Sequence, residues 1–97
     1  MEDLKQLSHY INRIVSDTRL TPVHISLSIA LYHAWMTSTC QQTYSVSRKQ
    51  LMRASHIQSK ATYHKALRDL EAFGYVKYHP SYHPVKASLV SLRLDVI

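Results

Sequence analysis

The chain has 97 residues, 45% of them hydrophobic, and a formal net charge of +6 at pH 7. This length predicts a single domain, 1–97, and excludes a second independent one, while the basic excess favours polyanionic partners. The lone Cys40 excludes an internal disulfide, and no apolar run reaches the ~20 residues that span a bilayer. We therefore expect a cytoplasmic protein that makes no membrane contact.

The first predicted element is an amphipathic helix over residues 2–16, within an N-terminal helical segment, 1–18. Its apolar face is formed at helical spacing by Leu4, Leu7, Ile11 and Ile14. A second helix is predicted to start at Thr21 and Pro22, a preferred cap residue followed by a proline at the first helical position. This helix runs to about Ser38.

The second predicted helix carries apolar stripes on two opposite sides, so we expect both sides to be covered. The stripe assigned to the domain core comprises Val23, Leu27, Ala30, Leu31 and Ala34. The stripe assigned to the N-terminal helix comprises Ile25, Ile29, Tyr32 and Met36. Periodicity leaves two alternatives open: the N-terminal helix packs within its own chain, or it forms a homodimer with the second stripe of another copy.

A short strand is predicted over 43–47, because Tyr44 and Val46 alternate with polar residues. Ser47 and Gln50 form a capping box that starts a helix of about two turns. After the polar break SHIQ, Ser59 is predicted to cap a longer helix that ends at the only glycine, Gly74. The extended segments 75–79 and 87–94 are then joined by PSYHPVK into a hairpin.

A short helix, a break of about four residues, a longer helix and a hairpin form the layout of a helix-turn-helix with a wing. In the longer helix, helical spacing directs one set of residues inward: Tyr63, Ala66, Leu67 and Leu70. The outward set comprises Ser59, Lys60, Thr62, His64, Lys65 and Arg68. No acidic residue precedes Asp69 in this helix, whereas an ordinary solvated face mixes charges of both signs. Such a surface favours contact with phosphates and base edges.

The run ATYHKALRDLEAFGYV, residues 61–76, resembles the recognition helix and first wing strand of winged-helix DNA-binding proteins. The fuller run SKATYHKALRDLEAFGYVKYHPSYHP, residues 59–84, is similar to small winged-helix proteins of bacterial mobile genetic elements. The resemblance implies an α+β, mostly helical fold: a winged helix-turn-helix of three helices and a small antiparallel wing over 21–94, plus the extra N-terminal helix. Met52 and His56 stand where the family often has alanine and glycine, and a histidine can adopt the left-handed conformation there, less easily than glycine.

The resemblance also implies roles for individual residues. Groove contacts fall on Ser59, Lys60, Thr62, His64 and Lys65. Backbone contacts from the preceding helix fall on Arg48 and Lys49, and wing contacts on His83 and Lys86. The departures at Met52 and His56, together with a turn that is about one residue longer, leave the docking angle and the list of base contacts open.

Other kinds of site lack the residues they need. His79 and His83 are four residues apart, but prolines make their segment extended and no further metal ligand is nearby. A Cys40 nucleophile would need His33 as its base, seven residues earlier on a helix that would have to continue that far. A single glycine excludes a glycine-rich phosphate loop. We therefore expect no catalytic residue, no metal, no cofactor and no small-molecule ligand.

The sequence thus predicts sequence-specific binding of double-stranded DNA by a small bacterial transcriptional regulator or mobile-element accessory factor. In this interpretation the helix 59–73 enters the major groove. Phosphates are neutralised by Arg48, Lys49, Arg53, Lys65 and Arg68, and the wing contributes Tyr82, His83 and Lys86. The alternative is a protein-interaction adaptor whose basic face docks on an acidic replication or transfer protein.

Overall fold

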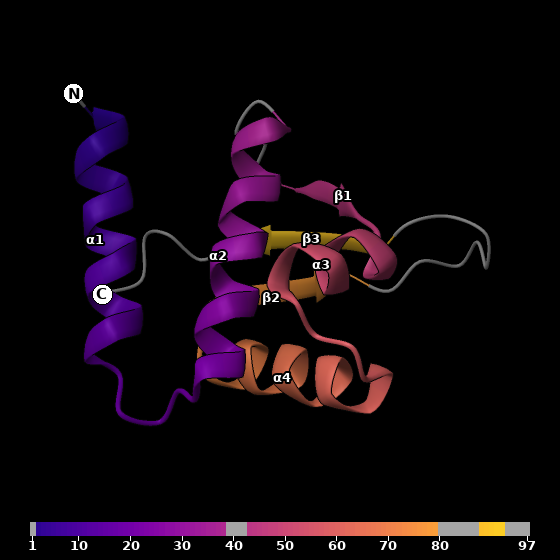
Figure 1. Cartoon of the computed structure of the whole chain (residues 1–97). Helices are drawn as coiled ribbons and strands as arrows, with labels where there is room; N and C mark the ends of the chain where they lie inside the picture. Colours follow the sequence, from indigo (N-terminus) through magenta and orange to yellow (C-terminus); the bar gives the residue numbers. More distant parts are fainter. Residues whose placement is uncertain (1, 39–42, 80–87, 93–97) are drawn as a thin grey trace.

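A computed structural model describes residues 2–38, 43–79 and 88–92 (Figure 1). Within these residues the fold is α+β and mostly helical, with four helices and a three-stranded antiparallel sheet. The elements in chain order are α1 (Glu2–Ser16), α2 (Pro22–Thr37), β1 (Tyr44–Val46), α3 (Arg48–Ser55), α4 (Lys60–Ala72), β2 (Val76–His79) and β3 (Ser88–Leu92). The predicted order of helices and strands is confirmed.

Three of the helices begin at the residues that the cap patterns indicated. Ser47 accepts a hydrogen bond from the Gln50 backbone N–H at 3.3 Å, and Ser59 accepts one from the Thr62 N–H at 3.2 Å. Thr21 caps α2, with Pro22 as the first helical residue. Local side-chain chemistry therefore fixes where α2, α3 and α4 start.

The C-terminal ends of α3 and α4 are each followed by a residue with positive φ. His56 ends α3 in the left-handed conformation, at φ 61° and ψ 32°, which a histidine can adopt less easily than the glycine often found there in winged-helix proteins. Residues 56–59 then separate α3 from α4, and within this break Ile57 is buried in the core. Gly74 follows α4 at φ 88°, a conformation that glycine adopts without a Cβ penalty. The chain thereby turns from α4 directly into β2.

The sheet has the order β1-β3-β2, so β3 lies in the middle and pairs antiparallel with both neighbours. Val90 of β3 stands opposite Tyr44 of β1 on one side and Tyr78 of β2 on the other. Val90 is fully buried, and the Tyr44 hydroxyl donates to the Leu31 carbonyl of α2 at 2.8 Å. Helix α2 is thus central: it contacts α3, α4 and β3, and α1 lies along its other side (Figure 1).

Helix α1 packs against α2 of the same chain, so the intrachain alternative is present in the structure. Its main contact is Tyr10, which is 1% exposed and whose ring lies 4.8 Å from that of Tyr32. The Tyr10 hydroxyl donates to the Ser28 carbonyl at 3.2 Å. The predicted stripe is correct for the buried Ile14 but wrong for Leu4, which is 58% exposed. The stripe contained only aliphatic residues and so omitted the tyrosine that anchors the helix.

The expectation that both sides of α2 are covered is only partly correct. The core stripe is buried at Leu27, Ala30 and Leu31. In the second stripe Tyr32 is buried, but Ile29 is 42% exposed and Met36 is 50% exposed. Because α1 is held mainly through Tyr10 and Ile14, it does not cover the whole length of that stripe. No helix in the described part of the chain is long and apolar enough to cross a membrane.

Candidate nucleic-acid interface

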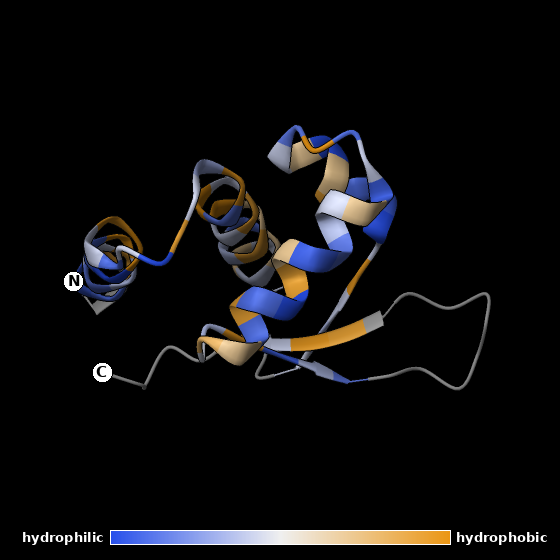
Figure 2. Cartoon of the chain, turned by 90° about the horizontal axis from the view of Figure 1, so that it is seen from below, coloured by the Kyte–Doolittle hydropathy of each residue, from blue (hydrophilic) through white to orange (hydrophobic). Residues whose placement is uncertain are grey.

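Helix α4 has one buried face and one exposed face, as its sequence period predicted. The four residues expected to point inward are buried: Tyr63, Ala66, Leu67 and Leu70. Figure 2, coloured by hydropathy, shows hydrophobic and hydrophilic residues alternating around this helix. Burial of this face against α2 and the sheet fixes which side chains of α4 remain outside.

The outward residues of α4 and the basic residues of α3 lie on the surface. All six predicted recognition residues are exposed: Ser59, Lys60, Thr62, His64, Lys65 and Arg68. The three predicted backbone contacts of α3 are exposed as well: Arg48, Lys49 and Arg53. We call these nine residues the basic face. The predicted wing residues Tyr82, His83 and Lys86, like Cys40, lie outside the described residues.

One member of the basic face has an acidic neighbour that the sequence pattern did not emphasise. Asp69 accepts a hydrogen bond from Lys65 Nζ at 3.0 Å, one helical turn earlier. The same Asp69 oxygen lies 2.9 Å from His24 Nε2 of α2. The hydrogen bonds from His24, and secondly from Lys65, hold the pKa of Asp69 below its ordinary value of 3.8. Lys65 is therefore partly neutralised by its own helix.

His24 explains how Asp69 is held in place. The Thr21 backbone N–H donates to His24 Nδ1 at 2.9 Å, so Nδ1 is an acceptor and the other ring nitrogen, Nε2, carries the proton. Nε2 then donates to Asp69, 45 residues along the chain. The buried His24 thus completes the N-terminal cap of α2 and links that end of α2 to Asp69 of α4 by a hydrogen bond.

The arginines of the basic face are not neutralised by an acidic neighbour as Lys65 is. Arg48, Arg53 and Arg68 form no ion pair with any residue that the structure describes. The same holds for Lys60 at the first position of α4. Their charges remain available to an anionic partner, which is the condition for strong electrostatic binding to phosphates.

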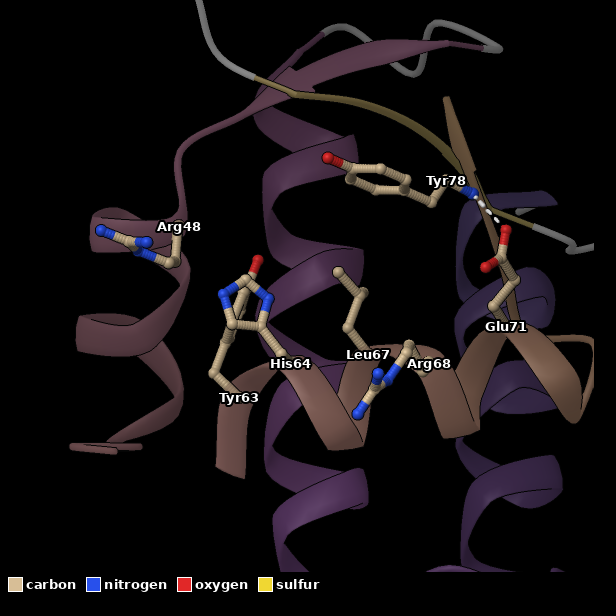
Figure 3. A pocket seen from close by; sticks show the side chains of 7 residues that line it. All are labelled: Arg48, Tyr63, His64, Leu67, Arg68, Glu71 and Tyr78. Atoms are coloured by element: carbon tan, nitrogen blue, oxygen red, sulfur yellow. Dashed lines mark hydrogen bonds between the residues drawn. The ribbon is translucent and has the colours of Figure 1, made fainter. Parts of the chain in front are cut away.

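Part of the basic face surrounds a hollow of about 270 Å³ between the start of α3, helix α4 and strand β2 (Figure 3). We call it the notch. Its lining comprises Arg48, Tyr63, His64, Leu67, Arg68, Glu71 and Tyr78. The sequence indicated the cations and the inward Tyr63 and Leu67, but not Tyr78 or Glu71. Only the register of β2 beside α4 brings those two residues to the same place.

In the α1–α2 region, by contrast, the arginines contact groups of their own chain. The Arg13 guanidinium lies 4.4 Å from the centre of the Tyr75 ring, and that of Arg19 lies 4.3 Å from the Phe73 ring. Asp17 accepts hydrogen bonds from Arg19 at 2.7 Å and from the Tyr75 hydroxyl at 2.8 Å. The Arg19 bond is the main reason why the pKa of Asp17 lies well below its usual range.

No protein-family model, no curated protein and no solved structure matches this chain. Among the described residues, no group of three histidine, cysteine, aspartate or glutamate side chains could hold a metal ion. Of the two histidines that are four residues apart, His79 lies 2.9 Å from the Ser91 hydroxyl of β3, and His83 is outside the described residues.

Proposed function

We propose that this chain is a winged helix-turn-helix protein that binds double-stranded DNA, as a small bacterial transcriptional regulator or mobile-element accessory factor in the cytoplasm. The observation that carries the proposal is the basic face, in which Arg48, Arg53, Lys60 and Arg68 are exposed and form no described ion pair. A folded protein that leaves so many cations on two adjacent helices has a surface complementary to a polyanion.

The dimensions of α4 suit the major groove. The helix has 13 residues and is therefore about 20 Å long, and a major groove about 12 Å wide admits an α-helix. With the apolar face of α4 against α2 and the sheet, Ser59, Lys60 and Thr62 project from its N-terminal end, where recognition helices contact bases. Arg48, Lys49 and Arg53 of α3 would contact the flanking phosphates.

The partly exposed second stripe of α2 supports a homodimer as the DNA-binding form. Ile29 and Met36 of α2 and Leu4 of α1 are large apolar side chains that are each at least 42% exposed. In a two-fold dimer these residues would be buried against a second copy, and two α4 helices would contact two half-sites. Sedimentation or light scattering measures the mass directly, and Ile29→Glu in a dimer should yield a monomer.

The proposal predicts a steep salt dependence of DNA affinity. If five or six phosphates are neutralised, the plot of log affinity against log salt concentration has a slope of about −5. Fluorescence anisotropy with a fluorescent duplex at several salt concentrations measures the slope. Lys5→Gln, an exposed lysine on α1 outside the basic face, is the matched control and should leave the slope unchanged.

The protein-adaptor alternative gives a different result in the same experiment. A domain that docks only on an acidic protein does not shift a random duplex at low salt, and that outcome would overturn the DNA proposal. If duplex DNA binds, selection of bound sequences from a random pool gives the preferred site. Lys60→Gln should then change the preferred sequence, whereas Arg53→Gln should weaken all sequences about equally.

A further inference from the structure

The notch combines cations with a floor of aromatic and aliphatic side chains. Tyr63 and Leu67 are buried and form the floor, and Tyr78 of β2 closes one side. The three basic groups, Arg48, His64 and Arg68, are exposed at the rim. A volume of about 270 Å³ is near the lower end of the range for small-ligand pockets. The size and chemistry suit one small unit that is anionic at one end and apolar at the other.

The His64 side chain does not project freely from α4, as a side chain that contacts bases in a groove would. Its ring packs edge-to-face on the Tyr63 ring, with 5.2 Å between the ring centres. Figure 3 shows the imidazole beside Tyr63 and facing the space next to Arg48. Tyr63 is buried and His64 exposed, as predicted, but the His64 ring at the rim is packed against the Tyr63 ring at the floor.

The Arg48 charge also acts on the floor of the notch. Burial raises the pKa of the Tyr63 hydroxyl, the Tyr78 hydroxyl raises it further, and the charge of Arg48 lowers it. The Tyr63 hydroxyl thus remains protonated at neutral pH and makes no hydrogen bond to a described residue. It is a hydrogen-bond donor next to an arginine, which is a suitable arrangement for a phosphate oxygen.

Glu71 limits where an anion can bind within the notch. Its carboxylate accepts a hydrogen bond from the Tyr78 backbone N–H at 2.9 Å and so lies at the β2 end. Arg48 lies at the opposite end, with His64 between them (Figure 3). Repulsion by Glu71 disfavours an anion beside β2 and favours one near Arg48, His64 and Arg68.

We propose that the notch holds one backbone phosphate of the bound DNA together with its deoxyribose. The phosphate lies among Arg48, His64 and Arg68, and the sugar packs on Tyr63 and Leu67. This assignment rests on the proposed DNA binding and changes one detail of it: His64 contacts the backbone, as Arg68 does, while Lys60 and Thr62 contact bases. Replacing His64 then weakens binding to all sequences instead of altering the preferred one.

The test replaces single phosphates of the selected duplex by uncharged methylphosphonates, one position at a time, and measures affinity. For the wild-type protein, a methylphosphonate at one position in each half-site, the phosphate held in the notch, should lower the affinity about 10-fold. This is the typical effect of losing a charge-assisted hydrogen bond. In Arg48→Gln and in Arg68→Gln the duplex should bind more weakly, and the affinity loss caused by the methylphosphonate at that same position should be smaller than in the wild-type protein. Arg53→Gln, the control on α3, should weaken binding but keep that sensitivity.

Three outcomes would overturn the notch assignment. The two notch variants could lose sensitivity at different phosphates, or at none, while DNA binding persists; the proposed function would then stand and the notch assignment would fall. A wild-type protein that binds no duplex would end both proposals. A free deoxynucleoside monophosphate could also bind saturably and shift the NMR signals of Tyr63 and Tyr78. If it did so at the nucleotide concentrations that displace the duplex, the occupant of the notch would be a soluble nucleotide. All variants concern exposed side chains, so their folding can be verified by circular dichroism.

Discussion

The two sides of this small domain use the same residue type in opposite ways. On the α1–α2 side, Arg13 lies over Tyr75, and Arg19 binds Asp17 and lies over Phe73. On the α3–α4 side, Arg48 and Arg68 form no ion pair with a described residue. Net charge counts all four arginines equally. Only the contacts distinguish cations that stabilise the fold from cations that remain available to a partner.

This difference separates stability from binding in a testable way. A cation that packs on an aromatic ring in the folded state contributes to the free energy of unfolding. An exposed cation without a partner contributes little to stability and can even reduce it through repulsion by its neighbours. We therefore expect substitutions on the α1–α2 side to lower stability and substitutions on the basic face to lower DNA affinity.

The largest expected effect is on the α1–α2 side, at Tyr10. Tyr10→Ala removes a ring that is 1% exposed and packed on Tyr32, so the free energy of unfolding should fall by about 3–5 kcal/mol. Tyr10→Phe, the matched control, loses only the hydrogen bond to Ser28 and should cost about 1 kcal/mol. Urea denaturation measures both. An alanine variant as stable as wild type would mean that α1 does not pack on α2 as described.

A smaller effect should distinguish two arginines. Arg13→Gln removes the cation–π contact with Tyr75 and should cost about 1 kcal/mol of stability, with no change in DNA affinity. Arg53→Gln should leave the free energy of unfolding within about 0.5 kcal/mol and make the salt slope of DNA binding shallower by about 1. Denaturation and salt titration of both variants give the result. The reverse pattern would contradict the division between the two sides.

The smallest expected effects are in acid. Hydrogen bonds lower the pKa of Asp17, chiefly from Arg19, and of Asp69, chiefly from His24. The folded state therefore favours the ionised carboxylates, and their stabilisation is present above the ordinary carboxyl value of 3.8. It is lost as the pH falls through the lowered folded values. Melting temperatures from about pH 6 to about pH 2 should thus fall less steeply in Asp17→Asn and Asp69→Asn.

Asp17 should account for more of this acid loss than Asp69. Its pKa is the more strongly lowered of the two, and the first cause is its hydrogen bond with Arg19. The acid-dependent part of stability would then come mainly from the α1–α2 side. Equal slopes for wild type and Asp17→Asn would show that the Asp17 contacts do not persist in solution.

Local patterns in the sequence were sufficient to predict the elements and the exposed face of α4. Thr21, Ser47 and Ser59 are caps whose partners are three residues away, so each helix start depends on nearby residues alone. The period of Tyr63 and Leu70 placed Lys60 and Arg68 outside for the same reason. The left-handed conformation of His56 could be anticipated only from the resemblance, because His56 stands where winged-helix proteins often have glycine.

Contacts between distant residues could not be predicted in this way. Nothing near His24 indicates that it meets Asp69, 45 residues later, or that Asp69 also binds Lys65. The notch depends on Tyr78, whose position is set by the pairing of β2 with β3 and not by α4. The anchoring role of Tyr10 was missed because a tyrosine within an aliphatic stripe has no preferred side until its neighbours in space are known.

The central position of β3 has a consequence for how the domain folds. Within the described residues, β1 and β2 have no strand partner other than β3, and Tyr44 of β1 pairs with Val90 across almost half of the chain. Closing so long a loop costs entropy that only the completed sheet and the core beneath it can offset. The helices can form early from their own caps, but the hollow between α3, α4 and β2 takes its shape only after the last of the described strands has inserted. During synthesis, therefore, the notch to which we assign a DNA phosphate should form in a single late step.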